Sequence, residues 1–260
     1  MSSEPFRVAS WNVNSIRRRL DAVLAWLGHN PVDVLVLQET KTIDDQFPAQ
    51  ALEESGYRSA VWGESQRNGV ALLARHPIDD VTKGLDDEQD DQARYIEGTV
   101  RGFRVASLYL PNGTAPDSPN FTYKLGYFER LRARLERALE NEESLIIAGD
   151  YNVAPAPVDV YDAEDCEDDV CFRPEVWAGW RGLLNQGFYD GFRAAHTDRR
   201  AYTWWPHQGR GFELDEGMRI DHLLCAPAVI DRLVESDIDP SPRGEKNASD
   251  HVPIWCSFRR

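Results

Sequence analysis

Several polar residues that could carry chemistry stand where predicted strands end. In the stretch AGDYN (148–152), Asp150 and Asn152 directly follow the apolar run LII. The same pattern recurs at five more predicted strands, which carry Asn12 and Asn14, Glu39, Tyr109 and Asn112, Asp221, and the pair Asp250 and His251. A single case would be ordinary turn chemistry, because Asp and Asn are common in caps and turns. Repetition at six strands predicts one convergent site at one edge of the sheets.

These residue types favour metal-assisted attack on a phosphodiester. Carboxylate and amide oxygens without a cysteine or histidine cluster suit a hard cation such as Mg²⁺ or Mn²⁺. His251 stands beside one aspartate and has another available to orient it, which suits stabilising a phosphoryl oxygen or moving a proton. A metal ion with a water, two carboxylates and a histidine can drive in-line attack on a phosphodiester.

Other common chemistries lack their motifs in this chain. It contains no G-x-x-x-x-G-K-[ST] and no G-x-G-x-x-G, which argues against a P-loop hydrolase and a dinucleotide enzyme. It also contains no G-x-S-x-G, which weakens a serine-hydrolase interpretation.

Strands alternating with helices are predicted to position the site. The strands are expected at 6–13, 33–39, 69–74, 95–100, 103–110, 144–150, 219–225 and 251–258. Those that are continuously apolar are expected to be buried on both faces. Amphipathic helices are expected at 15–30, 121–140 and 174–184. This pattern predicts an α/β sandwich of packed sheets covered by helices. No repeat or low-complexity linker divides the chain, which predicts a single domain over 1–260.

Composition limits the partners of the chain. Its 260 residues are 42% hydrophobic, which is ample for a packed core, and its net charge is −15. That charge argues against coating nucleic acid by bulk electrostatics, although a local basic rim is compatible with it. The segment 128–137 could be a DNA-binding helix, but its spacing favours an amphipathic surface helix. The acidic runs 85–91 and 159–169 are interpreted as solvated loops, with a calcium site in the second as the weaker alternative.

The sequence also indicates a cytoplasmic protein. We predict no membrane span and no signal peptide, because no apolar stretch has the length or flanks that either needs. The four cysteines are few and unevenly spaced, which predicts reduced thiols. Cys166 and Cys171 could begin a metal site, but no second cysteine pair or histidine pair follows them.

Seven motifs together resemble those of a known family. WNVNS, LQETK, NGVALLA, SLYLPNG, GDYNVAP, RIDHLL and SDHVP occur in the order and spacing of the exonuclease III family of DNA-repair nucleases, within the endonuclease/exonuclease/phosphatase superfamily. Single motifs such as SDH are weak, whereas the ordered set is specific and extends from about residue 6 to 258. The resemblance implies a four-layered α/β sandwich in which helices flank two packed mixed β-sheets.

The resemblance implies two groups of metal ligands. The main ion would be held by Glu39, assisted by Asn12 and Asp250. A second ion, where the family uses one, would lie near Asp150, Asn152 and His251.

It also implies catalytic roles. Asp150 matches the residue that positions or deprotonates the attacking water, and Asn152 matches the amide that stabilises the developing negative charge. His251 is expected to contact the scissile phosphate, while Asp221 holds its other ring nitrogen and fixes its tautomer.

Further residues are expected to bind the DNA backbone. Tyr109 and Asn112 resemble a phosphate-contacting pair of the family. Lys41 and Arg67 are predicted to contact backbone phosphates. Weaker candidates for the same contact are Arg210 and Arg219.

An apolar slot is expected to select the substrate. TWW (203–205) and GMRID (217–221) resemble segments that line an abasic-sugar pocket, with Trp204, Met218 and Ile220 as its walls. Such a slot accepts a sugar that lacks its base and excludes a normal nucleotide by size. The alternative is that these side chains belong to the core. FELDEG (212–217) is more acidic than the family pattern, which predicts modest and salt-sensitive affinity for DNA.

We therefore expect a Mg²⁺- or Mn²⁺-dependent class II apurinic/apyrimidinic endonuclease. It would hydrolyse the phosphodiester 5′ of an abasic site in double-stranded DNA and leave a 3′-hydroxyl. The family implies 3′→5′ exonuclease and 3′-phosphatase activities on 3′ ends as well, and a monomeric state.

Two other classes of function stay open at this point. A catalytically inactive regulator of the same fold would bind nucleic acid without cutting it, but the intact set of catalytic residues argues against that. A phosphoesterase acting on a small molecule or lipid headgroup is disfavoured by the apolar slot and by the absence of a predicted membrane element.

Overall fold

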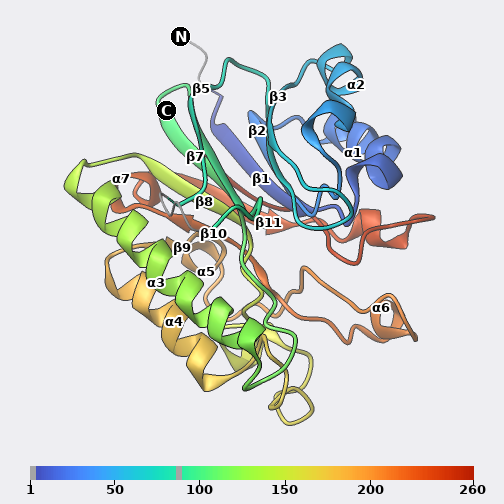
Figure 1. The fold of residues 1–260 in the computed structure, drawn as a ribbon, viewed down its shortest axis with the longest axis vertical. Coiled ribbons are helices and arrows are strands. Elements are labelled where there is room, and N and C mark those ends of the chain that lie inside the picture. The colour runs from blue at the N-terminus through green and yellow to red at the C-terminus, as the bar shows by residue number, and fades with distance from the viewer. Residues whose placement is uncertain (1–3, 86–89) are drawn as a thin grey trace.

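Two six-stranded β-sheets pack face to face, and helices cover their outer faces (Figure 1). The computed structural model describes residues 4–85 and 90–260. Both sheets are mixed, because each combines one parallel pair of strands with antiparallel pairs. The layers run helix, sheet, sheet, helix, which confirms the predicted four-layered α/β sandwich.

The first sheet is built around β1 and β2, which run parallel at its centre. Its strand order is β11-β12-β1-β2-β4-β3. The bounds are β1 Phe6–Asn12, β2 Val34–Gln38, β3 Arg58–Trp62, β4 Val70–Ala74, β11 Leu233–Ile238 and β12 Ile254–Phe258. Helices α1 (Ile16–His29) and α2 (Ala49–Glu54) cover its outer face. Val23 and Leu27 of α1 share one apolar cluster with Leu35 and Leu37 of β2.

The second sheet is built in the same way around the parallel pair β7 and β8. Its strand order is β5-β6-β7-β8-β10-β9. The bounds are β5 Asp79–Lys83, β6 Tyr95–Val100, β7 Phe103–Tyr109, β8 Leu145–Asp150, β9 Tyr189–Asp190 and β10 Asp221–Cys225. Helices α3 (Pro119–Glu140) and α4 (Pro174–Asn185) lie side by side on its outer face (Figure 1). The short helices are α5 (Gly191–Ala195), α6 (Gly211–Leu214) and α7 (Pro227–Ile230).

Local sequence explains where the long helix α3 begins and what it buries. The hydroxyl of Ser118 accepts a hydrogen bond from the amide of Phe121, and Pro119 occupies the first helical position. Phe128 and Leu131, on later turns of the helix, pack into the core. Segment 128–137 is therefore an amphipathic helix packed on the second sheet, as predicted.

All eight predicted strands are present, with ends that shift by at most three residues. Four strands were not predicted: β3, β5, β9 and β11. β3 is only half-buried, and β5 is mostly exposed, because each lies at the edge of its sheet. β9 has two residues, and β11 is an edge strand with a mixed burial pattern. These strands lack the alternating or continuous apolar pattern that marks a strand in sequence.

Polar side chains tie the two sheets together near the end of β2. In the parallel register of β1 and β2, Asn12 lies opposite Gln38, the residue that precedes Glu39. The amide of Gln38 donates to Ser107 Oγ of the second sheet at 3.0 Å, and that hydroxyl donates to the carbonyl of Leu37 at 2.8 Å. These groups are buried, so the bonds fix how one sheet sits on the other.

In the second sheet, the register brings three polar residues to one edge. Asp150 at the end of β8 lies opposite Tyr109 of β7 on one side and Asp221 of β10 on the other. The preceding residue has to be glycine, because a Cβ atom at Gly149 would lie 2.0 Å from the carbonyl oxygen of Leu108. The close approach of β7 and β8 therefore explains the glycine in AGDYN.

A buried ion-pair network lies beneath the segment that leads into β10. The guanidinium of Arg219, which is fully buried, donates to Asp159 Oδ1 at 2.7 Å and to Asp190 Oδ2 at 2.8 Å. Arg193 also donates to Asp159. Burial alone would raise the pKa of Asp190, but the charge of Arg219 outweighs it and holds that pKa below its usual range.

This network corrects two predictions. Arg219 cannot contact a DNA phosphate, because it is buried and bound to carboxylates. Asp159 is also not part of a solvated loop, because it is 1% exposed and two arginines neutralise it. In the other acidic run, Asp90 accepts hydrogen bonds from Tyr123 and Arg130 rather than being merely solvated. Residues 86–89 of that run lie outside the described residues.

The cysteines agree with prediction. All four are free and buried, which leaves Cys166 and Cys171 without a disulfide. In the part of the chain that the structure describes, no helix has both the length and the apolar character that crossing a membrane requires.

Replacing Arg219 by methionine should lower the free energy of unfolding by about 3–5 kcal/mol, because it leaves the buried carboxylate of Asp190 without its arginine and that of Asp159 with Arg193 alone. Urea denaturation of the purified variant measures this. The matched control is Arg210→Met, which breaks the exposed pair between Arg210 and Glu213 and should change stability little. Equal losses in the two variants would show that the network does not stabilise the fold as described.

Candidate active site

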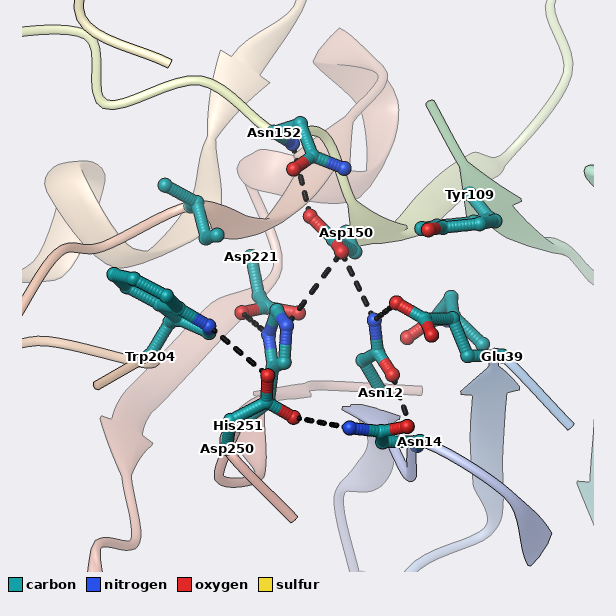
Figure 2. A network of polar contacts seen from close by, with 12 residues as sticks. Asn12, Asn14, Glu39, Tyr109, Asp150, Asn152, Trp204, Asp221, Asp250 and His251 are labelled. Carbon is teal, nitrogen blue, oxygen red and sulfur yellow. Dashed lines mark hydrogen bonds and ion pairs between the residues drawn. The ribbon is translucent and has the colours of Figure 1, made fainter. Parts of the chain in front are cut away.

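The predicted polar residues meet at one end of the two packed sheets, as Figure 2 shows. Asn12 ends β1 and Glu39 follows β2, so both come from the first sheet. Asp150 ends β8 and Asp221 begins β10, so both come from the second. His251 lies in the segment before β12. Each sheet thus supplies half of the site, as expected from polar residues at the ends of separate strands.

Asn12 joins the two halves. Its amide nitrogen donates to Glu39 Oε1 at 2.9 Å and to Asp150 Oδ2 at 3.0 Å (Figure 2). Its own oxygen accepts from the backbone amide of Asn14. One fully buried amide therefore sets the distance between carboxylates that belong to different sheets.

His251 lies between two aspartates. Its Nδ1 is 2.8 Å from Asp221 Oδ2, and its Nε2 is 3.7 Å from Asp150 Oδ2. All three side chains are almost fully buried. The bond to Asp221 fixes the orientation of the ring and leaves Nε2 facing the other carboxylate.

The backbone is left-handed at the points where the chain leaves the central strands. The φ angles of Glu39, Lys41 and Asn152 are +51°, +50° and +48°. Such conformations of residues other than glycine cost about 1–3 kcal/mol each and persist where the surroundings hold them. Their position here means that the sheets fix the side-chain directions at some cost in stability.

Three of the side chains could hold a cation. Ligand atoms of Glu39, Asp150 and His251 all lie within 4.8 Å of one another. Two carboxylates and one imidazole form a donor set that fits a hard divalent ion with water completing its coordination. Asp250, also predicted as a ligand, lines the same cavity and accepts hydrogen bonds from Asn14 and Trp204, and its role as a ligand stays a prediction.

Buried charges shift the acidity of these groups. Burial raises the pKa of Asp150, and the nearby carboxylates of Asp221 and Glu39 raise it further. Burial would lower the pKa of His251, but the carboxylates of Asp221 and Asp150 outweigh it and raise it well above its usual value. Burial would raise the pKa of Glu39, as it does that of Asp150. The ammonium of Lys41, 2.6 Å away, outweighs burial and holds the pKa of Glu39 below its usual value. The buried carboxylates of the site therefore strongly favour a positively charged group beside them.

Tyr109, Asn112 and Asn152 form another part of the wall around the site. Burial, followed by the charge of Glu39, raises the pKa of Tyr109 well above its usual value, so its hydroxyl stays protonated. Asn112 donates to Asn152 Oδ1 at 2.9 Å. Asn152 Nδ2 donates to the carbonyl of Leu110 at 2.9 Å, which uses one of its two hydrogens.

A cavity of about 420 Å³ opens from these residues. Its apolar side is formed by Trp204, Met218 and Ile220, which the structure brings together as predicted. The backbones of Trp204 and Met218 pair as an isolated β-bridge, and the indole nitrogen of Trp204 donates to Asp250 Oδ2 at 3.2 Å. Trp204 thus lines the cavity, whereas its neighbour Trp205 is buried in the core.

The basic residues predicted to contact phosphates are placed differently from one another. The ammonium of Lys41 contacts Glu39 Oε2 and Asn14 Oδ1 at the rim of the site. Arg67 is exposed and bound to Glu64, and it does not line the cavity. Arg210 is also exposed and is bound to Glu213. Contact of these three with DNA stays a prediction.

Sequence reasoning missed part of the wall. Thr114, Asp169, Val170 and Cys171 also line the cavity, and the thiol of Cys171 lies 3.8 Å from Asn152 Oδ1. Residues 169–171 lie at the end of the acidic run and just beyond it, far along the chain from any strand end, so no local pattern marks them. Asn14 was visible in WNVN, and the structure links it to both Lys41 and Asp250.

Replacing Asp221 by asparagine should lower the pKa of His251, because the carboxylate that stabilises the imidazolium is removed. NMR titration of the His251 ring in metal-free protein measures this. Asp45→Asn, a change at an exposed residue outside the site, is the control and should leave the pKa of His251 unchanged. An unchanged or higher pKa of His251 in Asp221→Asn would contradict the pairing.

Several solved structures are similar to this one over nearly their whole length. A 3′-5′ exonuclease from Neisseria meningitidis is 37% identical, with a TM-score of 0.95 over 98% of this chain and 100% of that chain. An AP endonuclease from Archaeoglobus fulgidus is 35% identical, with a TM-score of 0.94 over 97% of this chain and 99% of that chain.

Sequence comparison agrees. Exodeoxyribonuclease III of Haemophilus influenzae is 29% identical, covering 96% of this chain and 98% of that protein. The model of the endonuclease/exonuclease/phosphatase family matches residues 9–251, a span that contains every residue of the site. The chain therefore belongs to the endonuclease/exonuclease/phosphatase family and, within it, to the exonuclease III family of DNA-repair nucleases.

Proposed function

We propose that this nuclease is a Mg²⁺- or Mn²⁺-dependent AP endonuclease that cuts double-stranded DNA 5′ of an abasic site and leaves a 3′-hydroxyl. The observation that carries this is one cavity with two unlike sides. One side presents the carboxylates and His251, which Asp221 holds from behind, and the other presents the apolar group of Trp204, Met218 and Ile220. The first suits hydrolysis of a phosphodiester, and the second suits a sugar without a base.

The buried polar groups have complementary roles in this proposal. Asp150 is the proton acceptor for the attacking water, because burial raises its pKa and makes it a better base than an exposed aspartate. His251, protonated through its bond to Asp221, faces the phosphate with Nε2. The second amide hydrogen of Asn152 and the hydroxyl of Tyr109 stabilise the negative charge that develops on the phosphate.

The carboxylates of Glu39 and Asp150 would hold the cation, with Asn12 fixing them from behind, and the imidazole of His251 would join them as a ligand only in its neutral form. When bound, the ion supplies charge stabilisation at the phosphoryl oxygens and favours ionised water. We place Asp250 among the supporting residues of this metal site, because Asn14 and Trp204 already hold its carboxylate. Mg²⁺ and Mn²⁺ fit the oxygen-rich donor set better than softer metals.

The rim completes substrate binding in this proposal. Asn112, Lys41 and Arg67 would contact the DNA backbone, and the apolar side of the cavity would admit only a flipped abasic sugar. The net charge of −15 opposes DNA outside this rim, so affinity should fall steeply with salt. We further propose that the chain acts as a single catalytic domain, as a monomer, in the cytoplasm, where its four free thiols would stay reduced.

Activity on 3′ ends is the second candidate. The structure is as similar to a 3′-5′ exonuclease as to an AP endonuclease, with TM-scores of 0.95 and 0.94. The same phosphodiester chemistry could act on a terminal nucleotide or on a 3′-phosphate, so we propose these as further activities of one site.

Replacing Glu39 by glutamine should weaken binding of Mn²⁺ by at least about tenfold, since the loss of even an outer partner of a metal ligand has effects of that size. Electron paramagnetic resonance of free Mn²⁺ during titration measures the affinity. Glu53→Gln, on the exposed side of α2, is the matched control and should leave binding as it is. Equal affinity in both variants would remove Glu39 from the metal site.

The function is tested with a labelled duplex that carries one tetrahydrofuran abasic analogue. This analogue cannot undergo β-elimination, so a cut must be hydrolytic. We expect cleavage 5′ of the lesion in Mg²⁺, none in EDTA, and a rate about 10²–10⁴-fold lower in Asp150→Asn, the range that a positioned base supplies. Asp198→Asn, at an exposed position, is the matched control and should cut like the wild type.

An intact duplex beside the abasic one separates the two candidates. Degradation of both duplexes from their 3′ ends, without a cut at the lesion, would favour the exonuclease and contradict selection by the apolar slot. Binding without any cleavage would contradict the enzyme in favour of a regulator. Turnover of an inositol phosphate or a lipid headgroup, with both duplexes ignored, would overturn the DNA assignment.

A further inference from the structure

Lys124 of α3 is a fully buried lysine directly behind the active site. Its ammonium donates to three backbone carbonyls: Asn152 at 2.7 Å, Val170 at 2.7 Å and Asn112 at 2.9 Å. An ammonium has three hydrogens, so every donor of this side chain is used on the backbone. A buried charge is expensive unless it is fully satisfied, which makes this arrangement a built feature rather than a chance contact.

The three carbonyls belong to segments that lie far apart in the sequence. One follows β7, one follows β8 and one follows the acidic run before α4. Each segment contributes to the wall of the cavity, through Asn112, through Asn152, and through Val170 with its neighbour Cys171. Lys124 is thus a common anchor for three parts of the wall that arrive from different directions.

The anchor acts most directly on Asn152. This residue has the left-handed φ of +48°, and its backbone amide donates to Asp150 Oδ1 at 2.9 Å. Its side chain is held by Leu110 and Asn112. The bond from Lys124 to its carbonyl completes the set, so all four polar groups of Asn152 have partners. That bond stabilises the strained conformation which points the amide of Asn152 into the cavity.

We propose that Lys124 is a positioning residue, which holds Asn152 and Asn112 in register with Asp150 through its three bonds to the backbone. The inference rests on the proposed function of the same site. Lys124 does not line the cavity and therefore acts on catalysis through Asn152 rather than on the substrate itself. Loss of its bonds leaves DNA binding by Lys41 and Arg67 in place and misplaces Asn152, which meets the transition state.

The test is Lys124→Met, which keeps the length of the side chain and removes the charge and all donors. On the abasic duplex, kcat should fall about 100-fold, the size expected from a misplacement of about 1 Å, with KM changed less than about threefold. Lys83→Met is the matched control, because Lys83 is exposed and pairs with Asp44 away from the active site, and should keep the wild-type kcat. Loss through KM alone, or no loss, would overturn the proposal.

A double variant separates positioning from loss of fold. In an Asn152→Ala background, Lys124→Met should lower kcat by less than about threefold, because the group that it positions is already gone. A further 100-fold loss there would overturn action through Asn152. Where Lys124→Met does not yield folded protein, Lys124→Gln keeps two donors and is expected to show the same coupling.

Two more readouts keep this inference apart from the proposed function. If the wild-type protein does not cut the abasic duplex, the proposed function is contradicted. The kcat values of the wild type and of Lys124→Met are then compared on bis(p-nitrophenyl) phosphate, whose hydrolysis needs only the phosphodiester chemistry. Hydrogen exchange of residues 111–114, 151–153 and 169–172 needs no substrate. It should quicken in all three segments of Lys124→Met, and unchanged exchange would overturn the anchor whatever the activity.

Discussion

The separation of the two sheets is the constraint on which this active site depends. Asn12 bridges the two sheets, because its side-chain amide donates to a carboxylate of each. The buried hydrogen bond between Gln38, the residue before Glu39, and Ser107 also holds the sheets together. A shift of one sheet along the other would part Glu39 from Asp150. Packing of the core therefore sets the distance between Glu39 and Asp150, and the connecting segments add His251, Asn152 and Trp204 around them.

Burial also explains the electrostatics. Several acids lie within reach of one another where water cannot screen them, so their surroundings raise the pKa values of Asp150 and His251 and create a demand for positive charge. The protein meets this demand in two ways. Arg219 neutralises Asp159 and Asp190 permanently, whereas the group of Glu39, Asp150 and His251, which lines the cavity, is left open to a cation.

The fold and most of the site follow from local patterns, because strands at the centre of a sheet are apolar and polar residues at their ends stand out. Edge strands such as β5 carry no such pattern, since one side of them faces water. Buried ion pairs cannot be predicted from local sequence patterns for another reason. Asp159 and Arg219 are 60 residues apart, and each alone looks like a surface charge. Lys124 and Cys171 are invisible in the same way, because only the assembled chain shows what they touch.

One consequence of the topology concerns the order in which the chain is made. β1, the first strand, pairs with β12, the last, and His251 is translated just before that strand. A nascent chain that stops short of residue 251 has Glu39 and Asp150 but lacks the imidazole and leaves one side of β1 unpaired. The catalytic set is therefore complete only after residue 251 has been translated, and a product that stops before it lacks the imidazole that pairs with Asp221.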